Sequence, residues 1–469
     1  MNNYKEYFKD KKVTMLGLGL LGRGLNDAKF LAEAGADLTV TDLKTAEALA
    51  PTLSKLAKYN NPTKGRAGIK YSLGGHKIED FSDKDFILKA AGIPMNSPFI
   101  VEAVKNNIPV EMDESLFVKL CRELYGNSVV IVGVTGTRGK TTTTYMIYEL
   151  LKSEFGDHVH LGGNIKGLAT LPLIKKVQPG DILVMELSSW QLQGFGSAGI
   201  SPEVSVFTNF LPDHLNYYMT DGASEDVGMQ RYFDDKAKIF TNQIDENFLI
   251  LGDGMKKVIT ERYSGKPLAQ VLLPKISEFK TWKPKIPGEH NLWHIAQAAE
   301  VGRIFGLAEK KIKKVLENFG GVEGRMEFLR SVRGVEIYND TTATTPEALE
   351  VALKSLKEHL KGKGKLITIS GGADKKLDNQ QAAKHIIKYA DYAYLLAGTG
   401  TEIIKGVVLE KFGNQALVCD GLKMAVTMAM SVAKKGDVIV LSPGFASFGM
   451  FKNEFDRGEQ FVNLVKKLK

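Results

Sequence analysis

The chain has 469 residues, of which 43% are hydrophobic and 25% charged, a composition typical of globular proteins, and at about 150 residues per domain it predicts roughly three domains. The net charge of +8 is spread along the chain, which favours anionic small substrates over nucleic acid as partners. Two distant cysteines exclude a disulfide framework, and a polar start without any run near 18 apolar residues predicts a cytoplasmic protein with no membrane span.

The amino-terminal part alternates strand and helix patterns. A predicted strand enters a glycine-rich turn with Gly17, Gly19 and Gly22, and the next predicted strand leads to Asp42, 20 residues after Gly22. An acidic residue at this distance is typical of a dinucleotide-binding fold. The motif alone is weak, because any doubly wound sheet needs a tight turn here, and a second nucleotide loop later in the chain disfavours NAD. We predict a first domain over residues 1–126.

A second glycine-rich turn lies in the sequence IVGVTGTRGKTTTTY, residues 131–145. A strand pattern enters it and a helical pattern leaves it, so backbone N–H groups and the amino end of the helix can approach an anion. Lys140 can reach the β and γ phosphates of ATP, and the Thr141 hydroxyl can bind Mg²⁺. Val134 replaces the first glycine of the general motif, so the match is to a looser form. The predicted ATP-binding residues of this turn are Gly136, Thr137, Gly139, Lys140, Thr141 and Thr142.

Three polar side chains follow the next apolar strand patterns. Glu186 ends one predicted strand, and Asp213 and His214 come shortly after another. Ligands bind beyond the carboxyl ends of strands in an open parallel sheet, so we expect these side chains to converge on Mg²⁺ and the phosphates. Each also has a structural interpretation, as a helix-cap partner, a turn residue or a hydrogen-bonded loop histidine.

The segment after His214 carries two lysines, Lys236 and Lys238, on a predicted helix. Their charged surroundings predict solvated surface lysines, and nothing in the pattern distinguishes either one. The 26 residues from His214 to Ile239 are long for a connection, and we expect this segment to move over the site.

The carboxyl-terminal part repeats the order of strand, polar glycine-rich turn and helix. Separate turns of this kind contain Asp340, Lys375 and Ser447. This order predicts a further parallel α/β sheet with its loops gathered at one edge. The predicted fold class is therefore α/β with three domains, the second over residues 127–321 and the third over residues 322–469.

The chain contains, in order, the ten motifs TGTRGKTTT, GGNI, MELSSWQL, DHL, YFDDKAKIF, GEHN, GRMEF, YNDTTATTPEA, GGADK and SPGFASFGMFKNEFDRGEQF. Their order and spacing resemble those of the Mur ligases over essentially the whole chain. The resemblance implies a Rossmann-like UDP-binding domain, a central ATPase domain of the P-loop type with a parallel or mixed sheet, and a Rossmann-like carboxyl-terminal domain. The last motif is most similar to family members that use ATP to add D-glutamate to UDP-N-acetylmuramoyl-L-alanine through an acyl phosphate, in peptidoglycan precursor synthesis. The resemblance implies the nucleotide sugar, glutamate and ATP as partners, and we expect a monomer.

By motif match, the resemblance implies two Mg²⁺ ions, one held by Thr141 and Glu186 and the other by His214 and Lys236. It also implies that Lys236 is carbamylated, which turns a cation into an anion that can bind metal. This overrules the surface-lysine prediction, although two neighbouring aspartates are expected to favour the ammonium form, which resists carbamylation. The implied catalytic residues are Lys140, Glu186, His214, Lys236, Arg325 and Asp340. The implied ATP site also includes Asn291, Arg325 and Asp340. The implied substrate-binding residues are Gly19, Leu20, Leu21, Asp42, Asn164, Ser188, Lys375 and Ser447.

Several departures from the family pattern leave the amino acid open. His294 replaces the second asparagine of the adenine motif, and Thr342 replaces a lysine near the γ-phosphate. Leu21 and Leu43 replace hydroxyl residues in the uridine site, and the block around Ser447 is altered. The alternatives are L-glutamate or another acidic amino acid in place of D-glutamate. A ligase like folylpolyglutamate synthase, which shares the phosphate loop, and a nucleotide-binding protein without catalysis are further alternatives.

Overall fold

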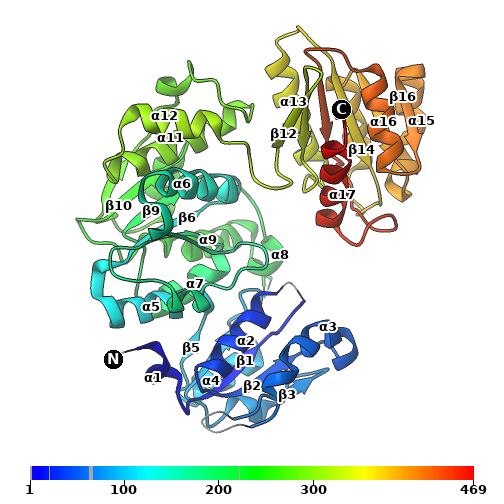
Figure 1. Ribbon diagram of the computed structural model, residues 1–469. Coiled ribbons are helices and arrows are strands. Elements are labelled where there is room, and N and C mark those ends of the chain that lie inside the picture. The colour runs from blue at the N-terminus through cyan, green and yellow to red at the C-terminus, as the bar shows by residue number, and fades with distance from the viewer. Residues whose placement is uncertain (1–2, 21, 63–66, 221) are drawn as a thin grey trace. The chain divides into compact units, whose positions relative to one another are not determined.

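The computed structural model describes residues 3–20, 22–62, 67–220 and 222–469. It contains three β-sheets, each flanked by helices (Figure 1), which confirms the predicted α/β class. Within these described ranges, no helix combines the length and the apolar character that crossing a membrane requires.

The chain divides into two compact units, Met1–Lys275 with Ala296–Ala308, and Ile276–Ile295 with Glu309–Lys469. The first unit holds two sheets and the second unit holds the third. Buried apolar side chains from both sheets of the first unit belong to one hydrophobic cluster, which explains why these sheets form a single unit. The domain boundaries after residues 126 and 321 stay predictions.

The first sheet has the strand order β3-β2-β1-β4-β5, and its strand pairs are parallel. This is the strand order of a Rossmann fold without its sixth strand, and in such a fold a ligand binds where the order reverses, between β1 and β4. The strands are β1 (Lys12–Leu16), β2 (Asp37–Asp42), β3 (Lys70–Leu73), β4 (Phe86–Lys89) and β5 (Val110–Glu111), and the helices are α1 (Tyr4–Phe8), α2 (Arg23–Glu33), α3 (Ala46–Leu56), α4 (Pro98–Lys105) and α5 (Asp113–Tyr125).

The second sheet is also parallel, in the order β11-β10-β9-β6-β8-β7. Its register sets Val134 of β6 opposite Glu186, the last residue of β8. The phosphate loop and Glu186 therefore leave the sheet at the same edge. The strands are β6 (Val130–Thr135), β7 (Val159–Gly163), β8 (Ile182–Glu186), β9 (Val204–Phe207), β10 (Phe248–Leu251) and β11 (Gln270–Leu272), and the helices are α6 (Lys140–Phe155), α7 (Ser189–Ala198), α8 (Leu215–Tyr218), α9 (Glu225–Ala237) and α10 (Met255–Arg262).

The long connection predicted after His214 is largely helical, because it contains α8 and α9. Tyr218, Met229 and Tyr232 form a buried apolar cluster within it. Packed helices satisfy their own backbone hydrogen bonds, so this segment is not an open loop. Its movement over the site stays a prediction.

The third sheet has the order β12-β13-β17-β14-β15-β16. Apolar clusters cover both of its faces, one against α16 and α17 and the other against α13 and α14. The strands are β12 (Glu327–Val332), β13 (Val335–Asn339), β14 (Leu366–Gly371), β15 (Tyr392–Leu396), β16 (Ala416–Cys419) and β17 (Val438–Leu441). The helices of the second unit include α12 (Glu309–Asn318), α13 (Pro346–Leu360), α14 (Asn379–Tyr389), α15 (Thr399–Phe412), α16 (Leu422–Val432) and α17 (Glu454–Lys466). Helix α11 (Glu289–Ile304) has residues in both units.

The third sheet is mixed, so the prediction of a parallel sheet is wrong at one edge. Strand β12 runs antiparallel to β13. Arg333 and Gly334 join the two strands and both have positive φ, 53° and 79°. A two-residue connection of this kind closes an antiparallel hairpin, whereas parallel strands need a long crossover.

Candidate active site

The phosphate loop begins where β6 ends and closes at Gly139, the amino-terminal cap of α6. Gly139 has a left-handed backbone with φ of 79°, a conformation that favours glycine. A Cβ atom on Gly136 would lie 1.9 Å from the Thr208 hydroxyl, so a larger residue does not fit without movement. The loop thus leads directly into the amino end of a 16-residue helix, which is the geometry that binds phosphate.

Two predicted site lysines reach carbonyl oxygens of the phosphate loop. Lys140 Nζ donates to the Thr137 carbonyl at 3.0 Å, and Lys236 Nζ donates to the Gly136 carbonyl at 2.7 Å. The structure therefore brings these lysines to one loop, although they come from α6 and α9.

Lys236 is buried, with 1% of its surface exposed, so the surface-lysine prediction is wrong. Burial lowers the pKa of Lys236 well below its ordinary value, and the charge of Lys140 lowers it further. The prediction that the neighbouring aspartates favour the ammonium form is confirmed in direction for Asp235, which raises the pKa of Lys236, but this effect does not prevail. Asp235 accepts hydrogen bonds from Gln193 and Tyr218, and its attraction for the lysine is outweighed by burial.

Glu186 is 3% exposed at the end of β8. Its Oε1 accepts a hydrogen bond from Asn164 Nδ2 at 3.1 Å, and the Asn164 N–H donates to the Glu186 carbonyl at 2.7 Å. Its Oε2 is buried without a hydrogen-bond partner among the described residues. A buried carboxylate oxygen without a donor is costly unless a cation meets it, so this atom fits a ligand of Mg²⁺.

His214 stands at the amino end of α8 with a left-handed backbone, and its ring lies 4.8 Å from that of Trp190. Burial lowers the pKa of His214; Asp213 raises it in part, and the charges of Lys236 and Lys140 lower it again. The lowered pKa of His214 favours the neutral ring, which is the form that binds metal.

No cluster of three His, Cys, Asp or Glu side chains suited to a metal ion occurs in the described part of the chain. The donors at the phosphate loop are instead the Glu186 carboxylate, the His214 ring and the Thr141 hydroxyl at the start of α6. Mg²⁺ commonly binds one or two carboxylates together with phosphate oxygens and water. This sparse set of donors therefore fits a metal that arrives with ATP.

A cavity of about 590 Å³ lies at the ends of β1, β2 and β4, and Gly19, Leu20 and Asp42 line it. The Asp42 carboxylate accepts hydrogen bonds from the N–H groups of Leu18 and Gly19 at 2.9 Å and of Lys44 at 2.8 Å. Burial raises the pKa of Asp42, but these donors lower it by more. Asp42 thus shapes the glycine-rich turn, and its contact with a nucleotide stays a prediction.

This cavity is lined by exposed apolar residues and by one buried lysine. Leu20 and Leu43 line it with 52% and 71% of their surfaces exposed. Lys89, which the sequence analysis missed, is 2% exposed and donates to the Ile93 carbonyl at 2.7 Å. Burial lowers the pKa of Lys89 to about 8. The predicted substrate residue Leu21 lies outside the described residues.

Ser188, another predicted substrate residue, caps α7. Its hydroxyl accepts from the Gln191 N–H at 3.3 Å, and the Gln191 side chain accepts from the Ser188 N–H at 2.8 Å. This capping box satisfies the first donors of the helix. A contact between Ser188 and substrate stays a prediction.

In the second unit, Asp340 holds the turn that carries Arg325. Asp340 Oδ1 accepts from the Met326 N–H at 3.0 Å, and Oδ2 accepts from the Ser442 hydroxyl at 2.9 Å. Burial raises the pKa of Asp340 to about 7, against the effect of these two hydrogen bonds. The Thr342 hydroxyl donates to the backbone of the same turn at 2.9 Å. Arg325 itself is exposed.

Lys375 and Ser447 lie on two turns that the structure brings together. Ala373 and Ala446 exchange backbone hydrogen bonds of 2.9 and 3.1 Å. Lys375 Nζ donates to the Thr344 hydroxyl at 2.8 Å, and Ser447 is 4% exposed. The prediction that these loops gather at one edge of the third sheet is confirmed for this pair.

Arg457 on α17 is fully buried, and the sequence analysis missed it. Its guanidinium donates to the Thr341 hydroxyl at 3.1 Å, the Thr341 carbonyl at 2.8 Å and the Phe445 carbonyl at 3.3 Å. One side chain thus fastens the turn after β13 to the turn after β17. An arginine in a charged helical stretch carries no signal of burial, so only the fold reveals it.

We expect Arg457→Met to destabilise the protein by about 3 kcal/mol, because it leaves buried acceptors without a donor. Urea unfolding followed by circular dichroism measures the change. Arg330→Met is the matched control, since Arg330 is exposed on β12 in the same unit and its loss should change stability by less than about 0.5 kcal/mol. Equal effects of the two substitutions would contradict the anchoring role of Arg457.

Asn291 and His294 lie on the first turns of α11. Asn291 is 4% exposed, and its Nδ2 donates to the Pro287 carbonyl at 2.7 Å. Burial, and then the neighbouring His290, lower the pKa of His294 to about 3. The residue that departs from the family motif is therefore a neutral histidine, and the contact of Asn291 with adenine stays a prediction.

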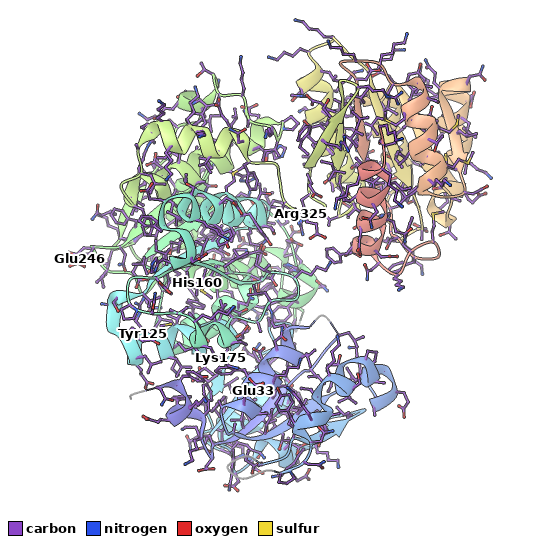
Figure 2. All side chains as sticks on the ribbon, viewed as in Figure 1. Glu33, Tyr125, His160, Lys175, Glu246 and Arg325 are labelled. Atoms are coloured by element: carbon purple, nitrogen blue, oxygen red, sulfur yellow. The ribbon has the colours of Figure 1, made fainter. Side chains whose placement is uncertain are left out.

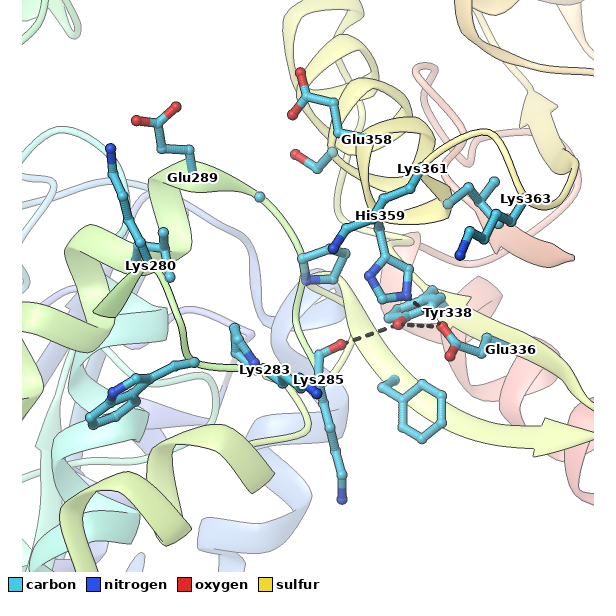
Figure 3. A pocket seen from close by; sticks show the side chains of 18 residues that line it. Lys280, Lys283, Lys285, Glu289, Glu336, Tyr338, Glu358, His359, Lys361 and Lys363 are labelled. Atoms are coloured by element: carbon cyan, nitrogen blue, oxygen red, sulfur yellow. Dashed lines mark hydrogen bonds and ion pairs between the residues drawn. The ribbon is translucent and has the colours of Figure 1, made fainter. Parts of the chain in front are cut away.

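A cavity of about 900 Å³ in the second unit lies beside β13 and the end of α13 (Figure 3). The Tyr338 hydroxyl beside it lies 3.1 Å from the Lys285 carbonyl and 3.0 Å from the Glu336 carboxylate, and these two acceptors share its single proton. None of the predicted site residues lines this cavity. Its lysines are Lys280, Lys283, Lys285, Lys361 and Lys363.

A phosphate loop on a parallel sheet, beside a buried carboxylate, defines a nucleotide-binding protein of the P-loop type. The Mur ligase middle domain matches residues 134–293, and the Mur ligase glutamate ligase domain matches residues 324–445. The UDP-N-acetylmuramoylalanine–D-glutamate ligase of Roseiflexus sp. (strain RS-1) is 33% identical over 97% of this chain and 98% of that protein. A protein of the same name from Borreliella burgdorferi (strain ZS7) is 34% identical over 98% of each chain. The chain belongs to the Mur ligase family.

Two solved structures support the fold. The UDP-N-acetylmuramate–alanine ligase MurC of Thermotoga maritima matches with a TM-score of 0.56 at 18% identity, over 97% of this chain and 99% of that one. The MurF ligase of Thermotoga maritima in complex with ADP matches with a TM-score of 0.57 at 18% identity, over 100% of this chain and 96% of that one. These matches confirm an α/β fold in three domains.

Proposed function

We propose that the protein is an ATP-dependent ligase that adds D-glutamate to UDP-N-acetylmuramoyl-L-alanine in peptidoglycan precursor synthesis. The observation that carries this proposal is the full-length likeness, at 33% and 34% identity, to two proteins named for that reaction. The phosphate loop, with Lys140 and Lys236 on its carbonyl oxygens, supplies a place for ATP in the same chain.

In the proposed reaction, the alanyl carboxylate attacks the γ-phosphate of ATP, forming an acyl phosphate and releasing ADP. The amine of glutamate then attacks the acyl carbon, loses a proton and displaces phosphate. Lys140 stabilises the negative charge that builds on the phosphoryl oxygens, because its Nζ already lies at the loop. Bound Mg²⁺ supplies further neutralisation of that charge.

The proposal includes two Mg²⁺ ions, one held by Thr141 and Glu186 and the other by His214 and a carbamylated Lys236. Carbamylation joins the neutral lysine amine to the carbon of CO₂ and releases one proton. Burial, which lowers the pKa of Lys236, favours that neutral amine.

The remaining predicted residues fall into two groups. In the second unit, Arg325, Asp340 and Asn291 are proposed to act on ATP, and Lys375 and Ser447 to hold the carboxylates of glutamate. Asp340 supports this role, because both its oxygens fasten the turn that presents Arg325 and the neighbouring loop. In the first unit, Gly19, Leu20, Leu21, Asp42, Asn164 and Ser188 are proposed to bind the nucleotide sugar.

L-Glutamate or another acidic amino acid remains the alternative substrate, because the turn that carries Ser447 contains Phe445 and an exposed Phe448. The names of the two relatives favour D-glutamate. They also weigh against a ligase like folylpolyglutamate synthase and against a protein without catalysis. A cytoplasmic location and a monomeric state belong to the proposal and are tested by cell fractionation and light scattering.

The test is release of ADP and product mass for the purified protein with ATP, Mg²⁺ and UDP-N-acetylmuramoyl-L-alanine. D-Glutamate and L-glutamate are supplied in separate reactions. We expect a product heavier by one glutamyl residue with D-glutamate and less than about 1% of that rate with L-glutamate. Equal or greater turnover with L-glutamate would overturn the assigned stereochemistry, and no turnover with either would overturn the proposed reaction.

A further inference from the structure

Arg23, the first residue of α2, lies in the wall of the 590 Å³ cavity. Its guanidinium reaches from α2 to α5 and to the end of β7 with the segment that follows it. It donates to the Glu114 carboxylate at 3.0 Å, the Gly163 carbonyl at 2.9 Å, the Leu168 carbonyl at 3.3 Å and Asn164 Oδ1 at 3.5 Å. No sequence motif assigned a role to this arginine.

The contacts of Arg23 lead on to the candidate metal ligand. Gly163 is the last residue of β7 and Asn164 follows it, and Asn164 binds Glu186 through both its side chain and its N–H. Two hydrogen bonds thus connect the guanidinium to Gly163 and Asn164, and two more connect Asn164 to Glu186, one to its carboxylate and one to its backbone carbonyl. The Glu186 Oε2 atom that lacks a partner among the described residues is fixed in direction by this arrangement.

A second branch from Arg23 reaches α7. Glu114 Oε1 also accepts from the Gln191 side chain, and Gln191 forms the capping box with Ser188. Glu114 is 1% exposed, so its buried charge is stabilised by its two donors, Arg23 and Gln191, and not by water. Arg23 stands where the predicted nucleotide-sugar cavity, the turn with Asn164 and the residues around Ser188 meet.

The carboxylates around Arg23 make its charge necessary. Asp27, one turn later on α2, and Asp113, at the start of α5, are 4% and 5% exposed and lie beside Glu114. Asp113 is held by the N–H groups of Thr170 and Leu171. Three buried acids with one guanidinium form a site in which loss of the cation leaves Glu114 uncompensated.

We propose that Arg23 is a positioning residue that couples the nucleotide-sugar cavity to Asn164 and, through Asn164, to the metal-binding geometry of Glu186. This inference rests on the proposed function, and it goes beyond it by assigning a residue outside the family motifs. Residues that orient a metal ligand typically change metal affinity or activity about 10–100-fold when they are removed.

A purely structural role for Arg23 is the alternative, and the chain offers a matched control for it. Lys175 and Glu33, labelled in Figure 2, form an ion pair of 2.6 Å that also joins α2 to the second sheet's segment. This pair has no hydrogen bond to Asn164 or Glu186. Lys175→Met therefore removes a link between α2 and the connection that follows β7 without touching the proposed path.

The experiment is a double-mutant cycle of Arg23→Met and Asn164→Ala. The first readout is the Mg²⁺ concentration that half-saturates ADP binding, measured by calorimetry without turnover. The second is kcat and KM for the nucleotide sugar. We expect Arg23→Met to raise the half-saturating Mg²⁺ concentration about 10-fold and to lower kcat about 10–100-fold. In the Asn164→Ala background, we expect Arg23→Met to change the half-saturating Mg²⁺ concentration and kcat by less than about a further 2-fold, because the effects of coupled residues are not additive.

Lys175→Met should leave both readouts unchanged. Full additivity of Arg23→Met and Asn164→Ala would overturn the proposal, and so would a change in melting temperature with normal Mg²⁺ dependence and kcat. Arg23→Lys keeps the charge but not the planar fork, so it should restore stability without restoring the Mg²⁺ dependence. If the wild-type protein does not turn over glutamate, the proposed function fails, while the calorimetric cycle still decides the role of Arg23.

Discussion

Lys236→Ala is expected to lower the ligase rate by about 10²–10³-fold, the scale of losing a preorganised charge-stabilising group. The substitution removes the nitrogen that the proposed carbamate is built on and the donor to the Gly136 carbonyl. A small cavity remains beside the phosphate loop, because Lys236 is buried. Formate or acetate added to the variant should bind there as a substitute anion and restore part of the rate.

The matched control is Lys238→Ala, which removes a lysine two residues later. Lys238 is half-buried and packs against Gly196, away from the phosphate loop, so we expect an unchanged rate. Labelling with ¹³CO₂ should give a carbamate signal by NMR in the wild type and none in Lys236→Ala. A normal rate in Lys236→Ala, or an equal loss in both variants, would contradict the proposed role.

Much of the fold follows from local patterns. Short apolar runs that end in glycine-rich turns identify buried parallel strands, since such strands are covered on both faces. The pattern at residues 366–369 matches β14, and that at residues 392–396 matches β15. The phosphate loop is equally predictable, because its glycines, lysine and helix are adjacent in the chain.

The features that the sequence hides depend on contacts between distant residues. Strand β12 carries mostly half-buried and exposed residues, so it lacks the apolar run that reveals the other strands. Lys236 and Arg457 sit among charged neighbours, and only the packing of their helices shows that both are buried. A pattern of charged residues predicts solvent-exposed lysines and arginines. This prediction fails for a lysine or arginine on the helix face that packs against the rest of the protein.

Glu186→Gln is expected to separate activity from stability. The glutamine keeps an oxygen for the Asn164 side chain and replaces a buried charged oxygen, without a donor among the described residues, by a neutral amide. We expect the ligase rate to fall about 10²–10³-fold and the half-saturating Mg²⁺ concentration to rise. The melting temperature should stay the same or increase, because sites built for a ligand often cost stability in its absence.

Glu203→Gln provides the opposite case in the same sheet. Glu203 accepts from Arg122 and, at 2.8 Å, from the Ile131 N–H, so its charge is paired. Glu203→Gln should lower the free energy of unfolding by about 1–2 kcal/mol and the melting temperature by a few degrees. The ligase rate should stay nearly unchanged. Thermal unfolding and Mg²⁺ titration of both variants measure this contrast. A stable, fully active Glu186→Gln enzyme would show that the orphaned Oε2 is no metal ligand, because a paired carboxylate and an unpaired one would then be equally dispensable to the reaction.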